Sequence, residues 1–290
     1  MALQKHLTLI FLSFFSFQAL FCAEREKSPV AAFWWSFLVP GGGYFYRGQT
    51  AKGAAYFTAT AGLAGWGLDR NKTTVGDEIN APLIYAQQLH VLQIYLSNRD
   101  FREVHETDGL GQLALAPFRR KNFSSPWVIG FALLGGGLNY AIARSEGAQR
   151  DFSDISTVRI LGNTFNRDRG FAVYSAYWVP LSLGAGMSEE ALFRGMIQSD
   201  WQERWGRGNG LLAASALFGL AHYDGKGASV GNALFATLAG LYLGWRFNAN
   251  GDRLSESIAA HFWFDAVAGA TLYLADPANN PLGAKVEFSF

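Results

Sequence analysis

Apolar runs recur along this chain and limit what it can fold into more than any other feature does. Hydrophobic residues make up 50% of the 290, and the runs fall at 31–46, 54–68, 127–143, 171–187, 210–222, 230–247 and 258–274. Crossing the core of a bilayer takes about 20 helical residues, so the shorter runs need a tilt, a re-entrant path or an extension by polar turns. The pattern predicts several membrane helices separated by polar segments.

Glycine is frequent within these runs, in segments such as LLGGGLNYA and TLAGLYLGW. Small residues let membrane helices approach closely, whereas the same glycines would weaken a helix exposed to water. Apolar and polar residues do not alternate with a period of two for long enough to suggest a membrane barrel. We therefore predict an all-α fold, a polytopic membrane helix bundle.

Charge and cysteine content exclude several classes of function. The chain has 24 basic and 23 acidic residues, a formal net charge of +1, and one cysteine, Cys22. Because no basic excess exists to neutralise phosphates, no nucleic-acid partner is expected. A single cysteine excludes an intrachain disulfide framework and a cysteine-based zinc cluster.

The N-terminus has the layout of a targeting segment. One lysine precedes an apolar run over 7–21, which is followed by Cys22, Ala23 and the charged residues EREK. This layout predicts that residues 1–23 are a secretory signal peptide or an uncleaved anchor helix. Phe21 is large for the residue before a lipidated cysteine, so cleavage after Ala23 is favoured over lipidation of Cys22.

Residues 24–75 are predicted to form an N-terminal membrane helical hairpin. Pro40 and three glycines interrupt the apolar run and predict a tight bend. The segment PGGGYFYRG resembles short membrane-hairpin modules of the Pro-Gly-x-Gly-x-x-Tyr-x-Gly type. We expect a structural role for it.

Residues 76–125 are a polar segment with one amphipathic helix. Its apolar positions follow a spacing of four, three and four residues: Tyr85, Leu89, Leu92 and Leu96. Such a helix either lies along the membrane surface or packs against its neighbours, and the sequence leaves both open. His90 and His105 lack clustered ligand partners, so both are expected to be structural or to face solvent.

Basic and aromatic residues flank the later apolar runs. The segment FRRK over 118–121 favours a cytoplasmic flank, but Arg144 at the opposite end of the next run leaves the orientation undecided. Four tryptophans near helix ends or faces are expected to be interfacial anchors: Trp201, Trp205, Trp245 and Trp263.

Three apolar helices in the second half each carry a pair of polar or aromatic residues four positions apart, which places both members on one helix face. The pairs are Glu190 and Arg194, Phe218 and His222, and His261 and Asp265, with Glu189 about 100° around the axis from Glu190. Ionisable groups in a bilayer cost about 2.5 to 3.5 kcal/mol each and normally face a bundle interior or a water-filled cavity. We predict that these groups share one polar intramembrane cavity.

In their order and separation, these motifs resemble those of the CPBP family. The motifs are Glu189-Glu190-x-x-x-Arg194, Phe218-x-x-x-His222 and His261-x-x-x-Asp265, each on an apolar helix. That family contains the type II CAAX prenyl endopeptidases, bacteriocin-processing and self-immunity proteins, and the Abi group of intramembrane proteases. The resemblance covers roughly 127–276, so residues 126–276 are expected to be a CPBP-like protease domain and 277–290 a tail.

The resemblance implies hydrolysis of a peptide bond at or within the membrane. Glu189 and His222 would activate a water as general base and orienting partner. Glu190 would assist or hold Arg194, a structural counter-ion, and His261 would stabilise the oxyanion. Family members carry Asn or Asp at the position of Asp265, and since an anion cannot donate to an oxyanion, Asp265 is expected to orient His261 or to act as a ligand. Phe218, Arg194 and Asp265 thus take supporting roles.

A metal-dependent mechanism is the alternative, which would make the protein a metalloendopeptidase. Glu190, His222, His261 and Asp265 form a credible zinc set with a place for a metal-bound water. However, no helix carries His-Glu-x-x-His, the most direct zinc signature. We expect metal-independent chemistry without a cofactor.

The sequence therefore favours an enzyme, an intramembrane endopeptidase. Two other hypotheses stay open: a non-catalytic binding or immunity protein that keeps the polar cavity, and a structural envelope protein in which the N-terminal hairpin is the working part. The expected partners are a peptide or protein substrate at the membrane and the lipid bilayer. The expected location is a bacterial cytoplasmic membrane, crossed several times. CAAX processing is the activity that the resemblance names, while the sequence defines the substrate only as a peptide bond near a membrane.

Overall fold

The structure is a computed structural model that describes residues 27–70, 79–99, 109–145, 155–223, 229–280 and 282. The predicted signal peptide or anchor over 1–23, with Cys22, lies outside the described residues. So do His105 and most of the predicted tail over 277–290.

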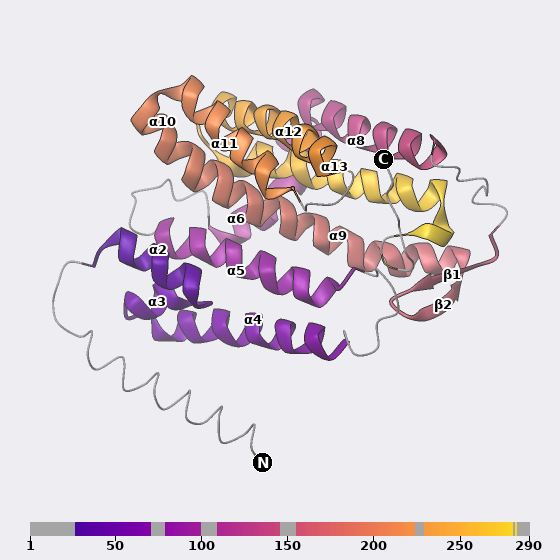
Figure 1. The fold of residues 1–290 in the computed structure, drawn as a ribbon, viewed down its shortest axis with the longest axis horizontal. Helices are drawn as coiled ribbons and strands as arrows, with labels where there is room; N and C mark the ends of the chain where they lie inside the picture. The colour runs from indigo at the N-terminus through magenta and orange to yellow at the C-terminus, as the bar shows by residue number, and fades with distance from the viewer. Residues whose placement is uncertain are drawn as a thin grey trace, which may run out of the picture.

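The described part of the chain is almost entirely helical, which confirms the all-α prediction (Figure 1). The long helices are α4 (Thr50–Arg70), α5 (Ala81–Arg99), α8 (Pro126–Ser145), α9 (Arg167–Leu192), α11 (Arg207–Ala221), α12 (Ser229–Ala249) and α13 (Leu254–Ala275). The short helices are α2 (Pro29–Leu38), α3 (Gly42–Tyr46), α6 (Leu110–Ala114), α7 (Arg120–Phe123) and α10 (Ser199–Trp205). Two 3-10 turns, η2 (Ala116–Phe118) and η5 (Pro277–Asn279), and a π-helical turn, η4 (Phe193–Gln198), complete the helical elements.

A small β-hairpin is the exception that the sequence analysis missed. Strands β1 (Thr157–Ile160) and β2 (Asn163–Asn166) pair in antiparallel fashion just before α9 begins. Leu161 and Gly162 form the two-residue turn with positive φ angles of 49° and 81°. Glycine tolerates this conformation readily, and such turns match the twist of paired strands.

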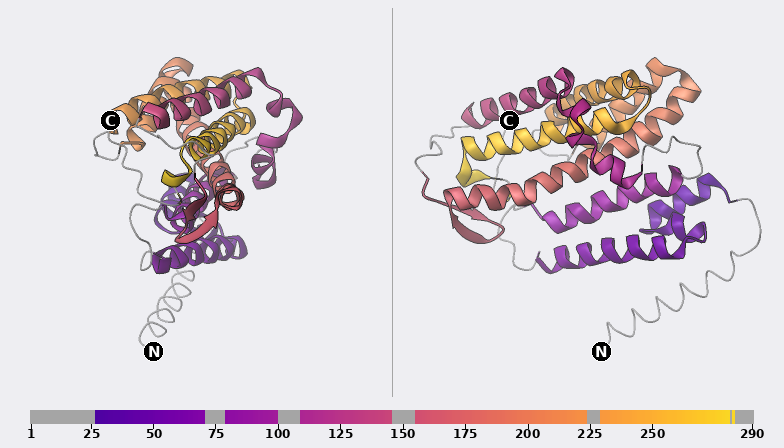
Figure 2. Two further views of the ribbon diagram at one scale, coloured as in Figure 1. Left: turned by 90° about the vertical axis from the view of Figure 1, so that its right-hand side faces the viewer. Right: turned by 180° about the vertical axis from the view of Figure 1, so that it is seen from behind.

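Helix α9 runs through the middle of the molecule (Figures 1 and 2). On one side it contacts α5, which itself packs against α2 and α4. On the other side it contacts α13, which packs against α8 and α12. The polar site described below lies where α9, α11 and α13 meet.

Helix α5 is packed inside the bundle. Of the two positions that the sequence left open, along the membrane surface or packed against neighbouring helices, the structure shows the second. Leu92 and Leu96, on its predicted apolar face, are buried in a cluster with residues of α9 and α13. Tyr85 and Gln88 reach from the same helix to backbone carbonyls of α9. Its opposite side is covered by α2 and α4.

The predicted bend after the first apolar run is a close turn between α2, α3 and α4. The Ser28 hydroxyl accepts a hydrogen bond from the Ala31 N–H and Pro29 opens α2, a favourable start for a helix. Gly41 then takes a φ of 77°, and a Cβ at this position would collide with the carbonyl of Gly53. Only glycine allows both the turn and this approach of the chain to α4.

Helices α9, η4 and α10 form one continuous helical path. The Asn166 side chain caps its start by accepting a hydrogen bond from the Arg169 N–H at 2.8 Å. Pro180 interrupts the backbone hydrogen bonds within α9, and the π-turn changes the pitch before α10. The path ends at Gly206, whose φ of 83° allows the chain to turn directly into α11.

By length and composition, two of the described helices can cross a bilayer: Pro126–Arg144 within α8, and α13. Apolar side chains also cover much of the outer surface of the bundle. Leu133, Leu134, Leu212, Leu234 and Leu238 are among those that are exposed. A surface of this kind suits a membrane helix bundle, whose surroundings are apolar too.

Candidate active site

The structure brings together all seven residues that the sequence motifs singled out. Glu189 and Glu190 lie in the last turn of α9, and Arg194 lies in the π-turn that follows. The other four come from two further helices: Phe218 from α11, His222 from the C-cap of α11, and His261 and Asp265 from α13. Their interactions join residues up to 72 positions apart along the chain.

Glu190 and Arg194 form the buried floor of the site. Their side chains are 0% and 2% exposed, and Arg194 Nη1 donates to Glu190 Oε1 at 2.9 Å. Arg194 Nη2 donates to the carbonyl of Gly240 in α12 at 3.0 Å, and the guanidinium lies 4.4 Å from the centre of the Phe218 ring. The ion pair, the carbonyl and the aromatic face together balance the arginine charge. Arg194 is thus held as a counter-ion inside the protein.

His261 is oriented by Glu190. Its Nδ1 lies 2.9 Å from Glu190 Oε1, and because an ionised carboxylate only accepts, the ring donates here. Its Nε2 lies 3.5 Å from Asp265 Oδ2 and 3.9 Å from Glu189 Oε2. The hydrogen bond that holds the imidazole at Nδ1 thus comes from Glu190, and the orienting or ligand role of Asp265, which lies near Nε2, stays a prediction.

His222 is oriented by its own helix. Its Nδ1 lies 2.7 Å from the carbonyl oxygen of Phe218, to which it donates. This hydrogen bond leaves Nε2 facing Glu189, 3.8 Å from Oε2. The Phe218 ring packs against the imidazole of His222 and lies edge-on to that of His261. The phenylalanine thus supports both histidines and the arginine.

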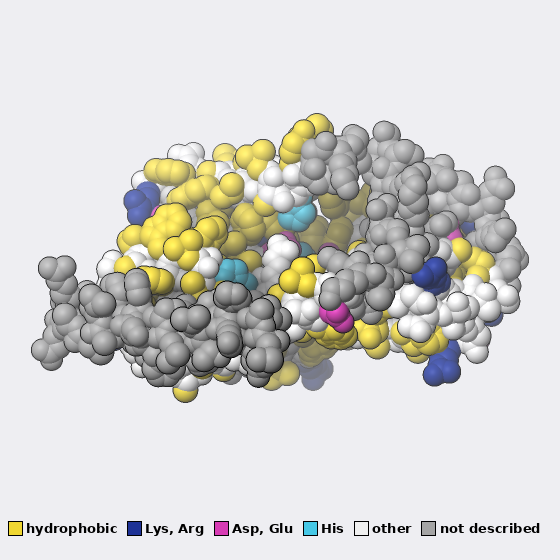
Figure 3. All heavy atoms as spheres, turned by 60° about the horizontal axis from the view of Figure 1, so that its bottom comes forward, with side chains coloured by type: hydrophobic (Ala, Val, Ile, Leu, Met, Phe, Trp, Pro, Cys, Tyr) yellow, Lys and Arg dark blue, Asp and Glu magenta, His cyan; other side chains and the backbone are white. Residues whose placement is uncertain are grey.

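Glu189 Oε2 faces the Nε2 atoms of both histidines. It is buried and has no hydrogen-bond partner among the described residues, and the same is true of Glu190 Oε2. Separations of 3.8 and 3.9 Å are too long for direct hydrogen bonds and suit a bridging water. The side chains of Glu189 and His222 are 30% and 40% exposed, although Glu189 Oε2 itself is buried. Figure 3 shows histidine and acidic side chains recessed among apolar ones on the face turned to the viewer.

The four groups considered as a zinc set do not converge on one position. Glu190 Oε1 is already shared by Arg194 and His261, and this hydrogen bond occupies His261 Nδ1. Within the described ranges, no group of three or more His, Cys, Asp and Glu side chains is arranged to hold a metal ion. In this arrangement the four groups are not gathered as metal ligands, and metal-independent chemistry stays a prediction.

Two features near the site had not been predicted. The π-turn follows Glu190 and carries Arg194, and such turns are frequent at functional sites. A second buried ion pair joins Arg246 of α12 to Glu256 of α13 at 2.9 Å, and Ser125 also donates to Glu256 at 2.9 Å. A search for residues four positions apart misses this pair because its members are ten positions apart and lie on different helices.

The remaining residues considered in the sequence analysis lie outside the site. His90 Nε2 lies 3.0 Å from the carbonyl oxygen of Phe37, which gives it a structural contact. Trp263 donates to the carbonyl of Pro117 at 3.0 Å, and the Trp245 ring packs edge-on to that of Trp127. Trp201 packs against the Trp205 ring on α10. Each tryptophan has a packing role, and interfacial anchoring remains their predicted function.

The fold and this site define a class: a helical membrane protein with a recessed cluster of carboxylates and imidazoles. Residues 172–267 match the family model described as "Type II CAAX prenyl endopeptidase Rce1-like", and all seven site residues fall within the matched region. The match supports membership of the CPBP family for this region of the chain. No curated protein and no solved structure matches the chain.

Proposed function

We propose that this protein is an intramembrane endopeptidase in which Glu189 and His222 activate a water. Membership of a family with protease members supports a protease-type enzyme in general. The observation that carries the finer proposal is the gap between Glu189 Oε2 and the Nε2 atoms of His222 and His261, at 3.8 and 3.9 Å. We propose that a water enters between these groups when the substrate binds, so that Glu189 acts on it as a general base.

In the proposed reaction, the water oxygen bonds to the peptide carbonyl carbon while Glu189 takes a water proton. His222 accepts a hydrogen bond from the same water through Nε2, because its Nδ1 proton is committed to the Phe218 carbonyl. The proton held by Glu189 then passes to the nitrogen of the scissile bond as the C–N bond breaks. A single carboxylate thus serves first as base and then as acid.

His261 stabilises the oxyanion in this proposal. It donates Nδ1–H to Glu190 and, carrying a second proton, donates Nε2–H to the developing negative charge. Asp265, 3.5 Å from Nε2, supports the protonated ring before the substrate binds. Arg194 pairs with Glu190 Oε1, the same oxygen that accepts from His261, and so holds that acceptor in place.

The proposed substrate is a peptide or protein whose scissile bond lies at the membrane. CAAX-box processing comes from the name of the matched family, and we include a prenylated peptide as one substrate to be tested. We propose a multi-pass location in a bacterial cytoplasmic membrane, with the peptide entering the site where Glu189 and His222 are partly exposed.

Cleavage assays on the full chain in proteoliposomes test the proposal. The substrates are a library of apolar-tailed peptides, with and without a prenylated cysteine. We expect Glu189→Gln and His222→Ala each to lower kcat by about 10² to 10⁴-fold, the usual contribution of general acid–base catalysis. Glu203→Gln is the matched control, because Glu203 is an exposed glutamate of α10 on the same helical path.

Full activity of the Glu189→Gln variant would overturn the assignment of the base. If a chelator abolishes the activity of the wild-type protein and zinc restores it, the reaction is metal-dependent. Tight peptide binding without cleavage by the wild-type protein would favour the non-catalytic binding function instead.

A further inference from the structure

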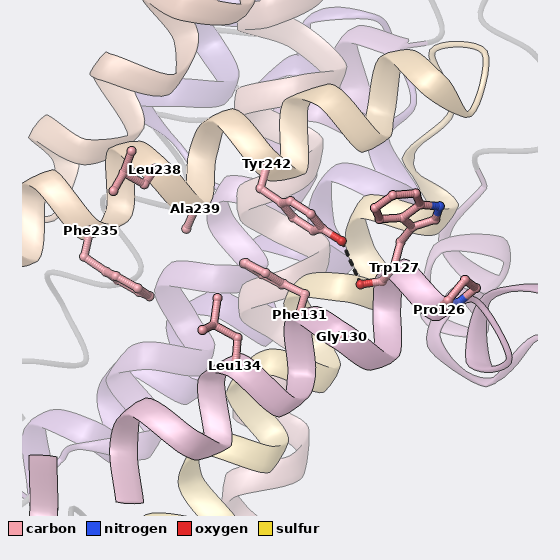
Figure 4. A pocket seen from close by; sticks show the side chains of 9 residues that line it. All are labelled: Pro126, Trp127, Gly130, Phe131, Leu134, Phe235, Leu238, Ala239 and Tyr242. Atoms are coloured by element: carbon pink, nitrogen blue, oxygen red, sulfur yellow. Dashed lines mark hydrogen bonds between the residues drawn. The ribbon is translucent and has the colours of Figure 1, made fainter. Parts of the chain in front are cut away.

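Helices α8 and α12 enclose an apolar groove that is separate from the site described above (Figure 4). Its volume is about 460 Å³, within the range of roughly 300 to 1,000 Å³ that is typical of ligand sites. The residues that line it include Trp127, Gly130, Leu134, Phe235, Leu238 and Tyr242. None of them belongs to the seven site residues, so the groove needs its own explanation.

The part of a ligand that enters this groove has to be hydrocarbon. The Tyr242 hydroxyl already donates to the Trp127 carbonyl at 2.7 Å, so it is occupied (Figure 4). Leu134 is 50% exposed and Leu238 65% exposed, so the groove is open along its side. Helix α8 is one of the two described helices able to span a bilayer, and an opening on its flank faces lipid.

One end of the groove has the composition of a membrane interface. Trp127 is the second residue of α8, which begins shortly after α7, the segment with Arg120 and Lys121. The Trp127 ring packs against that of Trp245 at 5.1 Å, and Arg246 lies over both rings. Tryptophans and basic residues gather at the level of lipid headgroups. Leu134, seven residues further along α8, is about 10 Å deeper in the bilayer.

At this end of the groove, α7 carries the positive charge that is available to a ligand. Arg246 is neutralised by Glu256, to which it donates at 2.9 Å. Arg120 is exposed, and Lys121 is exposed with a contact to the neutral Asn250 at 3.2 Å. A neighbouring apolar groove and basic cluster complement a molecule with a hydrocarbon chain and an anionic head.

We propose that the groove binds an acyl chain of an anionic phospholipid, whose phosphate headgroup is held by Arg120 and Lys121. The acyl chain lies between α8 and α12 and runs from Trp127 towards Phe235. Basic clusters beside membrane helices attract anionic lipids in this way. This inference does not depend on the proposed proteolytic function, because no residue of the groove or of α7 acts in that mechanism.

Native mass spectrometry of the full chain in detergent tests the hydrocarbon part. The probes are dioleoyl phosphatidylglycerol, which is anionic, and dioleoyl phosphatidylcholine, which is zwitterionic. Gly130→Leu puts a side chain into the groove, where a Cβ has no atom within 4 Å, so the helix itself tolerates the change. We expect it to weaken phosphatidylglycerol binding at least tenfold. Gly137→Leu is the matched control, since Gly137 lies on α8 outside the groove lining and its Cβ position is equally open.

The charge part is tested with Arg120→Gln combined with Lys121→Gln. We expect this pair to weaken phosphatidylglycerol binding by roughly tenfold and to leave phosphatidylcholine binding unchanged. The matched control is Lys52→Gln combined with Arg169→Gln, which removes two exposed charges from α4 and α9.

Three results would overturn the inference. If both lipids bind equally and the α7 variants do not change their binding, Arg120 and Lys121 do not bind the headgroup. If Gly130→Leu leaves lipid binding unchanged but slows cleavage of an apolar-tailed peptide, the groove binds the peptide substrate and not a lipid. If the protein is a dimer in detergent and Gly130→Leu dissociates it, the groove is an interface with a second copy of the chain.

Discussion

Arg194 and Glu190 differ from the other helical ion pairs of this chain in how deeply they are buried. The side chains are 2% and 0% exposed, so removing Arg194 leaves the Glu190 carboxylate inside the protein with only His261 as a partner. We predict that Arg194→Gln lowers the free energy of unfolding by about 3 to 5 kcal/mol. Unfolding in mixed micelles, followed by circular dichroism, measures this loss.

Arg204 and Asp200 provide the control for this prediction. They form another i, i+4 pair on the same helical path, at 2.9 Å, but the Arg204 side chain is 67% exposed. Arg204→Gln should therefore cost no more than about 1 kcal/mol. Similar losses for the two variants would show that burial does not set the strength of the Arg194 pair.

The sequence could predict which site residues share a helix face, but not which partners they meet across helices. A spacing of four predicted the pairing of Glu190 with Arg194, and the structure has it. The same rule suggested Asp265 as the partner that orients His261, whereas Glu190 from α9 accepts its hydrogen bond. Helical periodicity carries no information about residues 71 positions apart. The Gly240 carbonyl that binds Arg194 has no sequence signal at all, because every residue has a carbonyl.

Close packing of α11 on α12 sets the position of His222. A Cβ at Gly219 would collide with the hydroxyl of Thr237 and with the carbonyl of Ala233 in α12. The Gly219 carbonyl also accepts the N–H of His222 at 3.0 Å. We predict that Gly219→Ala lowers the free energy of unfolding by about 1 to 3 kcal/mol, since it overpacks the contact. The shift of His222 should lower kcat by up to about 10²-fold, as measured by peptide cleavage.

Gly208 is the control on the same helix. A Cβ at this position has no atom within 4 Å, so Gly208→Ala meets no obstacle. It should leave kcat unchanged and raise the free energy of unfolding by up to about 1 kcal/mol, because alanine is the better helix former. Equal kcat values for the two variants would mean that the distance between α11 and α12 does not control His222.

At the level of elements, the sequence predicted the helices better than their irregularities. Apolar runs and glycines predicted the helices and the bend at Gly41. The π-turn over Phe193–Gln198 contains no proline, and its one glycine, Gly195, does not distinguish it from the many other glycines in the apolar helices. Tyr95 of α5 lies where a Cβ on Gly195 would be, which is one such constraint. The β-hairpin was missed because strands of four residues are too short for a reliable alternation.

The N-terminal helices and the matched region are joined through α5. Gln93 donates to the Ser36 carbonyl at 2.8 Å and Ser97 shares a hydrogen bond with Ser36 at 2.6 Å, so α5 is tied to α2. Its other side packs on α9, the helix that carries Glu189. The domain boundaries at 75 and 125 remain predictions. These contacts indicate that the helices on either side of α9 depend on α5 for their packing.

The contact between α5 and α9 allows a test of this dependence. Tyr85 and Gln88 donate to the carbonyls of Tyr177 and Leu181, at 2.9 Å each, on either side of Pro180. Side-chain donors of this kind satisfy backbone groups near a proline in a membrane helix. We predict that Tyr85→Phe combined with Gln88→Ala lowers the free energy of unfolding by about 1 to 3 kcal/mol and preserves one cooperative transition. Gln87→Ala, at an exposed position of α5, should change it by less than about 0.5 kcal/mol. Two separate transitions in the double variant, with proteolysis retained after the first, would instead mean that the matched region folds and acts without the N-terminal helices.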